Sequence, residues 1–471
     1  MPNLDSSQAI SALMLPVRRL LKQPAVFVDP SATVGQAAAA MQNARVGSIL
    51  ITTEPPGIVS DRDLRGRVLA AGLGPQTNIA QVMTRPLKTI DADAPAFAAL
   101  RFMLQENVHH LPLVEDAKII GVISATDLLL QQNSNPLYLR RTLETLCEST
   151  EAAHYAGEIT ATVDALFQGG LGAAEISQII SSLNDALVKR LVEWAQARLG
   201  AAPAAFAWMV FGSEGRLEQA LLTDQDNALV FDDSGESGRN YFNQLAQLVV
   251  DGLIQAGFPR CPGGFMATGW CKPLSEWQQL FANWVRLPEP KALLGASIFF
   301  DFRAVAGTLS LESLEQIIAG AQNERLFLAH LLSDALGFRP PLGWFNWLRS
   351  ESGTVDLKKG GIAAIVGLAR TAALAAGSRA RSTLERLRVA GASGTVLSSE
   401  SAQEFAEIFP LLLRLRLRAQ LAEKKKGRPP TNKVNLAELS TLERRHLKEA
   451  LIIIKNAQED LRAAWRLDRL G

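Results

Sequence analysis

One sequence pattern occurs twice near the N-terminus of this 471-residue chain, and this repeat limits the possible folds more than any other feature. The first copy contains VFVDPSATVGQAAAAMQNARVGSILIT and GIVSDRDLRGRVL, and the second contains KTIDADAPAFAALRFMLQENVHHLPLV and GVISATDLLLQ. The matching pairs are Met41 and Met103, Gly57 and Gly121, Ser60 and Ser124, and Asp63 and Asp127. Short β-rich runs alternate with helical periodicity, which predicts strand, helix, strand, turn, strand and helix in each copy. A single copy buries little apolar surface, so we expect residues 15–72 and 79–133 to pack together as one α/β region, 15–133.

The repeat resembles a tandem pair of CBS domains, and VMTRP at residues 82–86 is typical of the start of a second copy. That family binds adenine nucleotides such as AMP or ATP in the cleft between its copies. The resemblance implies that Ser60 and Ser124 supply a hydroxyl and that Asp63 and Asp127 hold the ribose, since a carboxylate accepts two hydrogen bonds from a diol. A simpler interpretation stays open, in which the serines are helix N-caps and the aspartates are first-turn charges.

Residues 136–200 are expected to form a helical connector. NPLYLRRTLETLCEST and AAEISQIISSLNDALVKRLVEWAQARLG place apolar residues at helical spacing, and Gly200 is typical of a helix end. We place a second α/β domain after it, at residues 201–307, followed by a helical bundle at residues 308–471.

The stretch VFGSEGRLEQALLTDQDNALVF at residues 210–231 has the clearest chemical meaning. The apolar run AFAWMVF predicts a buried strand, which Gly212 and Ser213 interrupt before the helix-forming composition of EGRLEQALL. A strand that leads through a Gly-Ser turn into a helix presents backbone N–H groups to an anion. We therefore expect a phosphate beside Gly212 and the hydroxyl of Ser213, and Arg216 is a further candidate for holding it.

Asp224 and Asp226 lie where a second apolar run, NALVF, begins. On a strand, residues two apart point to the same face, and two carboxylates beside a phosphate are expected to hold Mg²⁺ against a triphosphate. Asp301 interrupts LLGASIFFDFRAVAG, which we expect to be a strand, and a lone buried Asp is costly unless it is paired or metal-bound. We predict Asp224, Asp226 and Asp301 as catalytic, metal-binding carboxylates, with Arg303 able to neutralise Asp301 or to contact phosphate. The enzyme hypothesis depends on folding bringing these three carboxylates together.

The Gly-Ser turn followed by Asp-x-Asp resembles the polymerase-β type nucleotidyltransferase fold. FGSEGRLEQALLTDQDNALVF, CPGGFMA, SIFFDFRAVAG and VDLKKGG are similar to a nucleotidyltransferase domain of unknown function that occurs beside CBS domains in bacterial signal-transduction proteins. That family is similar to the uridylyltransferases that modify PII signalling proteins. The resemblance covers roughly residues 140–465, and it implies Gly212 and Ser213 at phosphate and Asp224 and Asp226 as metal ligands.

Simpler interpretations of these residues stay open. Asp224 fits a turn, Asp226 fits a surface charge, Arg216 can pair locally with Glu218, and Asp301 can form a structural pair with Arg303 on a sheet edge. A fold does not guarantee its chemistry, so a non-catalytic nucleotide-sensing protein is the alternative to an enzyme. A small-molecule or RNA nucleotidyltransferase is a further alternative, and a net charge of +1 weakens the RNA version.

Helical spacing prevails from about residue 308 onward. Ser440 and Glu443 match a capping box at the start of the last helix. Lys358 and Lys359 precede a Gly-Gly break, where they either reach a triphosphate or protein substrate or lie in a solvated loop. EKKKGRPP at residues 423–430 is one short basic loop in a near-neutral protein, so we expect no DNA binding.

Together these features predict an α/β multi-domain signalling protein of the bacterial cytoplasm. Three scattered cysteines do not make a disulfide framework, and no apolar run reaches membrane-spanning length, so we expect no membrane partner. The expected activity is Mg²⁺-dependent transfer of a nucleoside monophosphate from a nucleoside triphosphate to an acceptor hydroxyl, on a protein by analogy. Adenine nucleotide at the CBS pair would regulate it, and a homodimer is expected because CBS pairs commonly dimerise.

Overall fold

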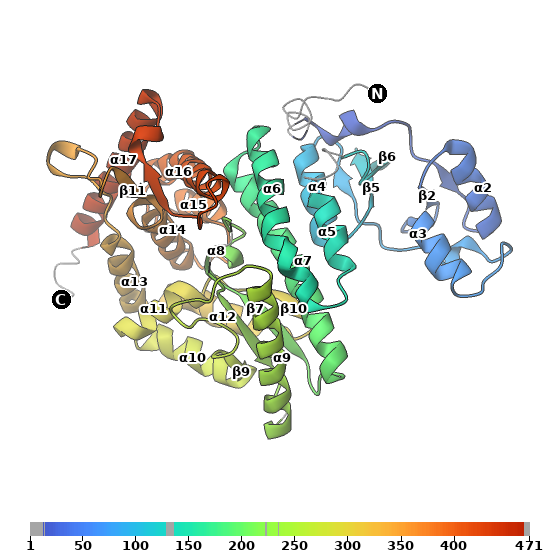
Figure 1. Cartoon of the computed structure of the whole chain (residues 1–471), viewed down its shortest axis with the longest axis horizontal. Coiled ribbons are helices and arrows are strands. Elements are labelled where there is room, and N and C mark those ends of the chain that lie inside the picture. The colour runs from blue at the N-terminus through green and yellow to red at the C-terminus, as the bar shows by residue number, and fades with distance from the viewer. Residues whose placement is uncertain (1–12, 14, 129–135, 222–223, 234, 466–471) are drawn as a thin grey trace. The chain divides into compact units, whose positions relative to one another are not determined.

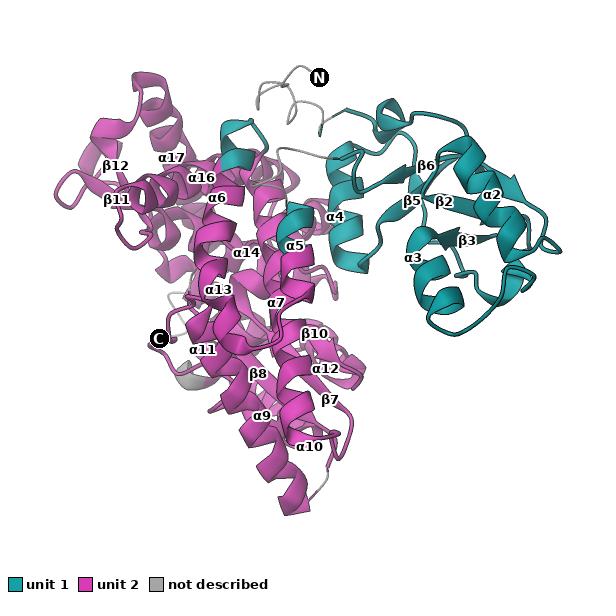
Figure 2. Cartoon of the chain, turned by 45° about the vertical axis from the view of Figure 1, so that its right-hand side comes forward, with its two compact units in different colours: residues 1–140, 165–171 teal, residues 141–164, 172–471 magenta. Residues whose placement is uncertain are grey.

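The computed structural model describes residues 13, 15–128, 136–221, 224–233 and 235–465, and Figure 1 shows its elements along the chain. It divides into two compact units, residues 1–140 with 165–171 and residues 141–164 with 172–471 (Figure 2). Each unit is described by itself below. Among the described helices, none is both long and apolar enough to cross a bilayer.

The first unit has two three-stranded sheets of identical topology, as the sequence repeat predicts. In each sheet the first strand runs parallel to the second, and the third runs antiparallel to the second. The strands are β1 (Phe27–Val28), β2 (Ser48–Ile51), β3 (Gly57–Ser60), β4 (Ile90–Asp91), β5 (His110–Glu115) and β6 (Lys118–Ser124). The helices are η2 (Val17–Leu20), α2 (Val34–Ala44), α3 (Asp61–Asp63), η3 (Leu64–Leu69), η4 (Ile79–Gln81) and α4 (Ala96–Glu106). The helix expected at the end of the second copy extends into residues 129–135, outside the described residues.

Each copy is completed by chain from the other copy. The amides of Val17 and Arg18, at the start of the first copy, donate to carbonyls at Ala94 and Ala92 of the second. In return, residues 75–84 pair with the first copy, and Ile79 and Val82 belong to its buried core. The two copies therefore share one structure, as expected for a repeat whose single unit is small.

The predicted connector is helical. It contains α5 (Pro136–Glu144), η5 (Ser149–His154), α6 (Tyr155–Gln168) and α7 (Ala173–Leu199). Gly200 follows α7 with a positive φ of 89°, so this glycine ends the helix as expected.

The second unit is built on a four-stranded mixed sheet in the order β10-β7-β8-β9. The strands are β7 (Phe206–Val210), β8 (Asn227–Phe231), β9 (Cys271–Pro273) and β10 (Arg303–Gly307), and β7 and β8 match the predicted strands. Alternate side chains of β7 point to opposite faces. Met209 joins a core with aromatic residues of the helices α10 (Leu274–Arg286) and α11 (Pro290–Phe299), while Phe206 packs against Phe242 of α9 (Gly235–Gln255).

The C-terminal part is mostly helical, as predicted, and packs beside the sheet within the same unit (Figure 1). Its helices are α12 (Glu312–Gly320), η6 (Ala321–Asn323), α13 (Arg325–Gly337), η7 (Trp344–Asn346), η8 (Lys358–Ile362), α14 (Ala363–Ala375), α15 (Thr383–Ser393), α16 (Ser399–Lys425), η9 (Leu436–Glu438) and α17 (Thr441–Trp465). The Ser440 and Glu443 capping box before α17 is confirmed by two reciprocal hydrogen bonds. A two-stranded sheet of β11 (Thr354–Asp356) and β12 (Lys433–Asn435) was not predicted.

Candidate active site

The pairing of β7 with β8 brings the Gly-Ser turn beside Asp226. Val210 faces Asn227 in the antiparallel register, and the Phe211 amide donates to the Asp226 carbonyl at 3.0 Å. Gly212 follows with φ of +55°, a conformation that glycine adopts without steric cost. A Cβ on Gly212 would lie 3.4 Å from Oδ2 of Asp226, so the end of one strand and the start of the next form a single surface.

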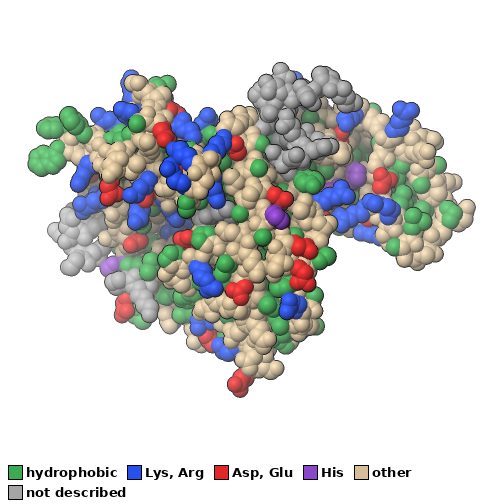
Figure 3. Space-filling view, viewed as in Figure 1, with side chains coloured by type: hydrophobic (Ala, Val, Ile, Leu, Met, Phe, Trp, Pro, Cys, Tyr) green, Lys and Arg blue, Asp and Glu red, His purple; other side chains and the backbone are tan. Residues whose placement is uncertain are grey.

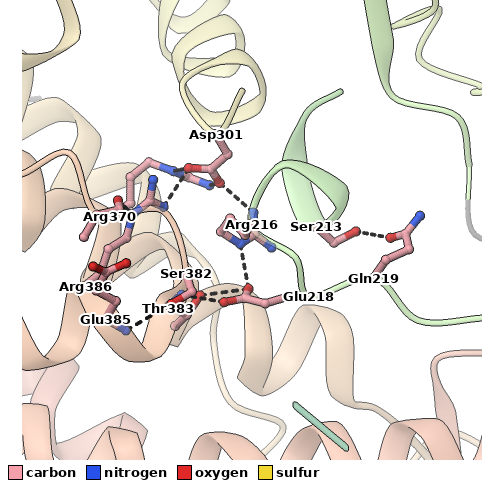
Figure 4. A network of polar contacts seen from close by, with 11 residues as sticks. Ser213, Arg216, Glu218, Gln219, Asp301, Arg370, Ser382, Thr383, Glu385 and Arg386 are labelled. Carbon is pink, nitrogen blue, oxygen red and sulfur yellow. Dashed lines mark hydrogen bonds and ion pairs between the residues drawn. The ribbon is translucent and has the colours of Figure 1, made fainter. Parts of the chain in front are cut away.

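Ser213 lies in α8 (Gly212–Gly215), a single helical turn. The first hydrogen bond of this turn runs from the Gly215 amide to the Phe211 carbonyl, so the preceding amides begin the helix as the sequence predicts. The Ser213 hydroxyl donates to Oε1 of Gln219 (Figure 4). The predicted longer helix over EGRLEQALL is wrong, because the helix ends at Gly215 and Leu217 adopts a left-handed conformation.

Asp224 and Asp226 precede β8 instead of lying within it. Asp224 is exposed and Asp226 is half-buried. Burial raises the pKa of Asp226, and Asp224 raises it further, whereas a bond from the Cys261 thiol to Oδ1 at 3.4 Å and the amine of Lys358 act in the opposite direction. A bound cation would offset both the cost of burying the charge of Asp226 and the repulsion between Asp224 and Asp226.

Two carboxylates fit a Mg²⁺ ion that arrives with its substrate. Mg²⁺ keeps several waters and is commonly bound by one or two carboxylates together with substrate phosphates. Within the described residues, no group of three His, Cys, Asp or Glu side chains is placed to hold a metal without such a substrate. Asp224 and Asp226 are therefore the residues that would hold the ion.

Asp301 has different partners, and its prediction as a third metal ligand is corrected. Its side chain is fully buried, and its carboxylate pairs with Arg216, Arg370 and Arg386 at 2.5–2.6 Å (Figure 4). Burial alone would raise the pKa of Asp301, but the three arginines outweigh burial and hold this pKa well below its usual range. Both oxygens face guanidinium groups, so a metal ion at Asp301 would meet three positive charges.

The chain around Asp301 also differs from the predicted strand. Residues Pro290–Phe299 form α11, and only Arg303–Gly307 form β10. Arg303 does not neutralise Asp301, because both ends of its guanidinium bind the carboxylate of Asp185 on α7. The expected pairing of these two neighbours is therefore also corrected.

Arg216 is buried between two carboxylates instead of reaching freely toward a phosphate. Its Nε donates to Glu218 at 2.7 Å, the local pair that the sequence left open, and its Nη1 donates to Asp301. Glu218 also accepts bonds from the backbone amide and the hydroxyl of Thr383, at the start of α15. This network links the Gly-Ser turn to the C-terminal helices (Figure 4).

A cavity of about 150 Å³ opens beside the Gly-Ser turn. Ser213 and Arg216 line it from the α8 side, and Lys358 and Arg416 line it from the C-terminal helices. Burial lowers the pKa of Arg416 to about 10, and burial likewise lowers the pKa of Lys358, although that side chain reaches solvent. The lining of the cavity thus includes the phosphate-binding candidate Ser213 and two cations from the C-terminal helices.

Three residues that the sequence analysis passed over belong to this region. Arg416 is buried on a mostly apolar face of α16, and a charge within an apolar helical stripe was the available signal. Glu214 receives a bond from Gln219, and burial together with Asp185 raises the pKa of Glu214 to about 8. Cys261 belongs to the CPGG turn, and its thiol donates to Oδ1 of Asp226.

In the first unit, Ser60 and Asp63 form the capping box that the sequence left open, and Ser124 and Asp127 make similar side-chain bonds at the start of a turn. Asp63 accepts bonds from the amide and hydroxyl of Ser60, and Asp127 accepts the same bonds from Ser124. The second oxygen of Asp63 faces Arg67 at 3.3 Å, and that of Asp127 faces the exposed Lys22 at 2.6 Å. A ribose would have to displace these surface partners, which surface ion pairs allow at small cost.

The adjacent His109 and His110 lie where β5 starts, and only His110 is inside the strand. His110 begins β5 and contacts the backbone of the first copy near Gly47. Burial lowers the pKa of His110, while Asp61 raises it.

Comparison with known proteins identifies three kinds of domain in the chain. The family described as "Putative nucleotidyltransferase DUF294" matches residues 157–291, and the family described as "Putative nucleotidyltransferase substrate binding domain" matches residues 325–465. The CBS domain family matches residues 17–70 and 79–132.

The individual relatives described next each match a third of the chain or less, or only slightly more. The CBS domain-containing protein CBSCBSPB2 of Arabidopsis thaliana is 30% identical over 169 residues, which are 35% of this chain and 32% of that protein. The CBS domain-containing protein YhcV of Bacillus subtilis is 28% identical over 26% of this chain and 89% of its own length. A solved CBS domain protein from Pyrobaculum aerophilum, complexed with AMP, is 26% identical, covers 25% of this chain and 93% of that chain, and has a TM-score of 0.23.

The family matches follow the order of elements along the chain. The Gly-Ser turn and the two carboxylates lie in the first nucleotidyltransferase match, and the helices that carry Lys358 and Arg416 lie in the second. The chain therefore carries, in order, a CBS domain pair, a domain of the DUF294 nucleotidyltransferase-like family and a domain of the matching substrate-binding family.

Proposed function

We propose that the second unit transfers a nucleoside monophosphate from a nucleoside triphosphate to an acceptor hydroxyl and releases pyrophosphate. The observation that carries this proposal is the closeness of Gly212 to Asp226, whose Oδ2 lies 3.4 Å from where a Cβ on Gly212 would be, so that the Gly-Ser turn borders the two carboxylates. The family matches support the same class of reaction.

The residues divide this task between them. Gly212 and Ser213 bind phosphate oxygens through the first amides of α8 and the serine hydroxyl. Asp224 and Asp226 hold Mg²⁺, which when bound screens the charge of the phosphates and lowers the pKa of the attacking hydroxyl. Asp301 keeps Arg216 in place behind the turn and takes no part in binding the ion.

A second candidate function is a nucleotide-sensing protein without catalysis. The arginine partners of Asp301 favour it, because the three carboxylates that the sequence hypothesis required do not converge. Two carboxylates are sufficient to bind Mg²⁺ with a triphosphate, so transfer remains our first proposal.

The decisive experiment follows label from the α-phosphate. Purified full-length protein is incubated with Mg²⁺ and α-labelled ATP, UTP, CTP or GTP, and label is sought on candidate proteins, RNA, small molecules and the chain itself. Asp226→Asn should lower transfer at least about 100-fold, in line with the loss of one charge-stabilising group in other active sites.

Asp232→Asn is the matched control, because Asp232 is exposed at the opposite end of the same strand. It should transfer like the unmodified protein. Undiminished transfer by Asp226→Asn would reject the metal assignment, whereas binding of triphosphate without any transfer would favour the sensor.

For the acceptor we propose a protein hydroxyl. The similarity to PII uridylyltransferases supports a protein, and the near-neutral net charge of +1 gives no overall attraction to RNA. The label experiment separates protein, RNA and small-molecule acceptors directly.

For the first unit we propose that AMP or ATP binds between the CBS copies and changes the transfer rate. The CBS family match supports binding there, with Asp63 and Asp127 as the ribose-holding residues. We further propose a cytoplasmic homodimer, which a mass measurement in solution tests.

A further inference from the structure

The cavity beside Ser213 is lined by both apolar and charged side chains. Leu331, Ile362, Val366 and Leu413 form apolar parts of its lining. Arg216, Arg370, Lys358 and Arg416 bring four positive charges to it, and Glu218 and Asp334 bring two negative charges. Cations therefore outnumber carboxylates around the cavity, which favours an anionic guest.

Two of these cations, Lys358 and Arg416, are near carboxylates but within ion-pair distance of none among the described residues. Arg216 and Arg370 already pair with Asp301, but within the described part of the chain neither Lys358 nor Arg416 makes an ion pair. Arg416 is only 3% exposed, and its Nε donates to the neutral Oδ1 of Asn432 at 2.7 Å. A buried, unpaired guanidinium is costly unless it meets an anion, so a ligand is the natural partner.

The cavity lies on a defined side of the reacting centre. Ser213 belongs both to the cavity lining and to the proposed phosphate-binding turn. Lys358 lies close enough to Asp226 and Asp224 for their charges to influence its amine. The cations are therefore placed to meet phosphates that extend from the carboxylate pair past Ser213.

We propose that this cavity is the site for the β- and γ-phosphates of the nucleoside triphosphate and for pyrophosphate as it leaves, with Lys358 and Arg416 as their charge partners. This inference rests on the proposed function and assigns the leaving-group side of that same site. The acceptor then approaches from the side of the α-phosphorus opposite the cavity, because attacking and leaving oxygens lie in line.

With this assignment, the bonds, the electron pair and the proton of the transfer step are all accounted for. The acceptor oxygen forms a bond to the α-phosphorus while the bond from the α-phosphorus to the bridging oxygen breaks. The electron pair of the broken bond leaves on pyrophosphate, and the acceptor proton passes to water. Negative charge grows on the leaving group, where Lys358 and Arg416 stabilise it.

Size and charge agree with a phosphate-sized guest. A cavity of about 150 Å³ in another protein is large enough to bind benzene. The segment that provides both cations, residues 325–465, contains 23 Lys and Arg against 13 Asp and Glu, although the whole chain is nearly neutral. Figure 3 shows Lys and Arg side chains gathered over α15 and α16.

The test measures binding of inorganic pyrophosphate and tripolyphosphate to the full chain by calorimetry, without Mg²⁺. Lys358→Met and Arg416→Met should each weaken binding roughly 10-fold or more, as expected for a charged hydrogen bond. Lys359→Met and Arg414→Met are matched controls, because these cations are exposed neighbours that do not line the cavity, and they should bind like the unmodified chain.

Arg416→Lys keeps the charge if the methionine variant fails to fold, and it should bind more tightly than a neutral variant. In the transfer assay, Lys358→Met should lower the rate with a triphosphate while AMP binding at the first unit is unchanged. Unaltered polyphosphate affinity in both cavity variants would overturn the inference.

The two proposals fail separately. Asp226→Asn should lose transfer yet keep pyrophosphate binding, because Mg²⁺ is absent from the binding test. A chain that never transfers label but binds pyrophosphate through Lys358 would reject the enzyme and keep the anion site. A chain that transfers label but binds pyrophosphate equally well in every variant would keep the enzyme and reject the anion site.

Discussion

Asp301 connects three segments at the scale of single residues. Its carboxylate neutralises Arg216 beside the Gly-Ser turn, Arg370 of α14 and Arg386 of α15. Removing one member of a buried ion pair usually costs more than the pair itself contributes, because the remaining charge stays buried. Asp301 is therefore a structural anchor of the second unit.

Asp301→Asn should destabilise the second unit by about 3–5 kcal/mol, the usual range for breaking a buried pair. Urea unfolding followed by tryptophan fluorescence measures the change, and Asp460→Asn, at an exposed site, is the control. The arginines depress the pKa of Asp301, so its contribution is present above the unfolded pKa near 4 and is lost as pH falls further. A variant as stable as the control would contradict this role.

Local sequence identified the right neighbours at one end of the site and the wrong ones at the other. Gly212 lies beside Asp226 because consecutive antiparallel strands bring a turn and a strand start together. The partners of Asp301 could not be predicted, because Arg370 and Arg386 come from helices about 70 to 85 residues later. A lone buried aspartate signals a counter-ion without revealing whether it is a metal or an arginine.

At the scale of elements, the short helix α8 depends on close approach to the chain before β10. A Cβ on Gly215 would lie 1.6 Å from the carbonyl oxygen of Asp301, which belongs to rigid backbone. Any side chain at Gly215 therefore forces α8 and the chain at Asp301 apart.

Gly215→Ala should cost about 1–3 kcal/mol or more, as overpacking does, and should weaken triphosphate binding because α8 moves. Gly320→Ala is a suitable control, since nothing lies within 4 Å of a Cβ there. Thermal unfolding and nucleotide titration report the two effects. Equal behaviour of the two variants would show that α8 tolerates displacement.

Strands with clear boundaries were predicted, and the ambiguous apolar run was not. β7 and β8 are short apolar segments between turn residues, which favours strands. The run before Asp301 reads equally well as a buried helix, and Ala292, Leu293, Leu294 and Ala296 have high helix propensity. Periodicity alone does not separate these alternatives, so α11 required the tertiary structure.

At the scale of the whole molecule, the two units belong to one chain, and regulation is a proposal that rests on this covalent link. AMP or ATP should change the transfer rate about 5-fold or more, a common size for coupling between sites. Asp63→Ala with Asp127→Ala should remove the change, while Glu54→Ala, in an exposed turn of the first copy, should preserve it. Nucleotide binding to the first unit without any change in rate would reject the coupling.

The repeat predicted the topology of the first unit but not the exchange of segments between its copies. Matching sequences assign each strand to its own copy, whereas residues 75–84 pair with the copy that precedes them. Exchange of this kind depends on the path of the connecting chain, which internal similarity does not record.

This exchange has a consequence for how the CBS pair can be gained or lost. Val17 and Arg18 complete the edge of the second copy, and Ile79 and Val82 fill the interior of the first. A deletion that removes one copy therefore also removes residues that the other copy needs to complete its sheet and its hydrophobic core. Recombination that yields a folded product would have to transfer both copies together.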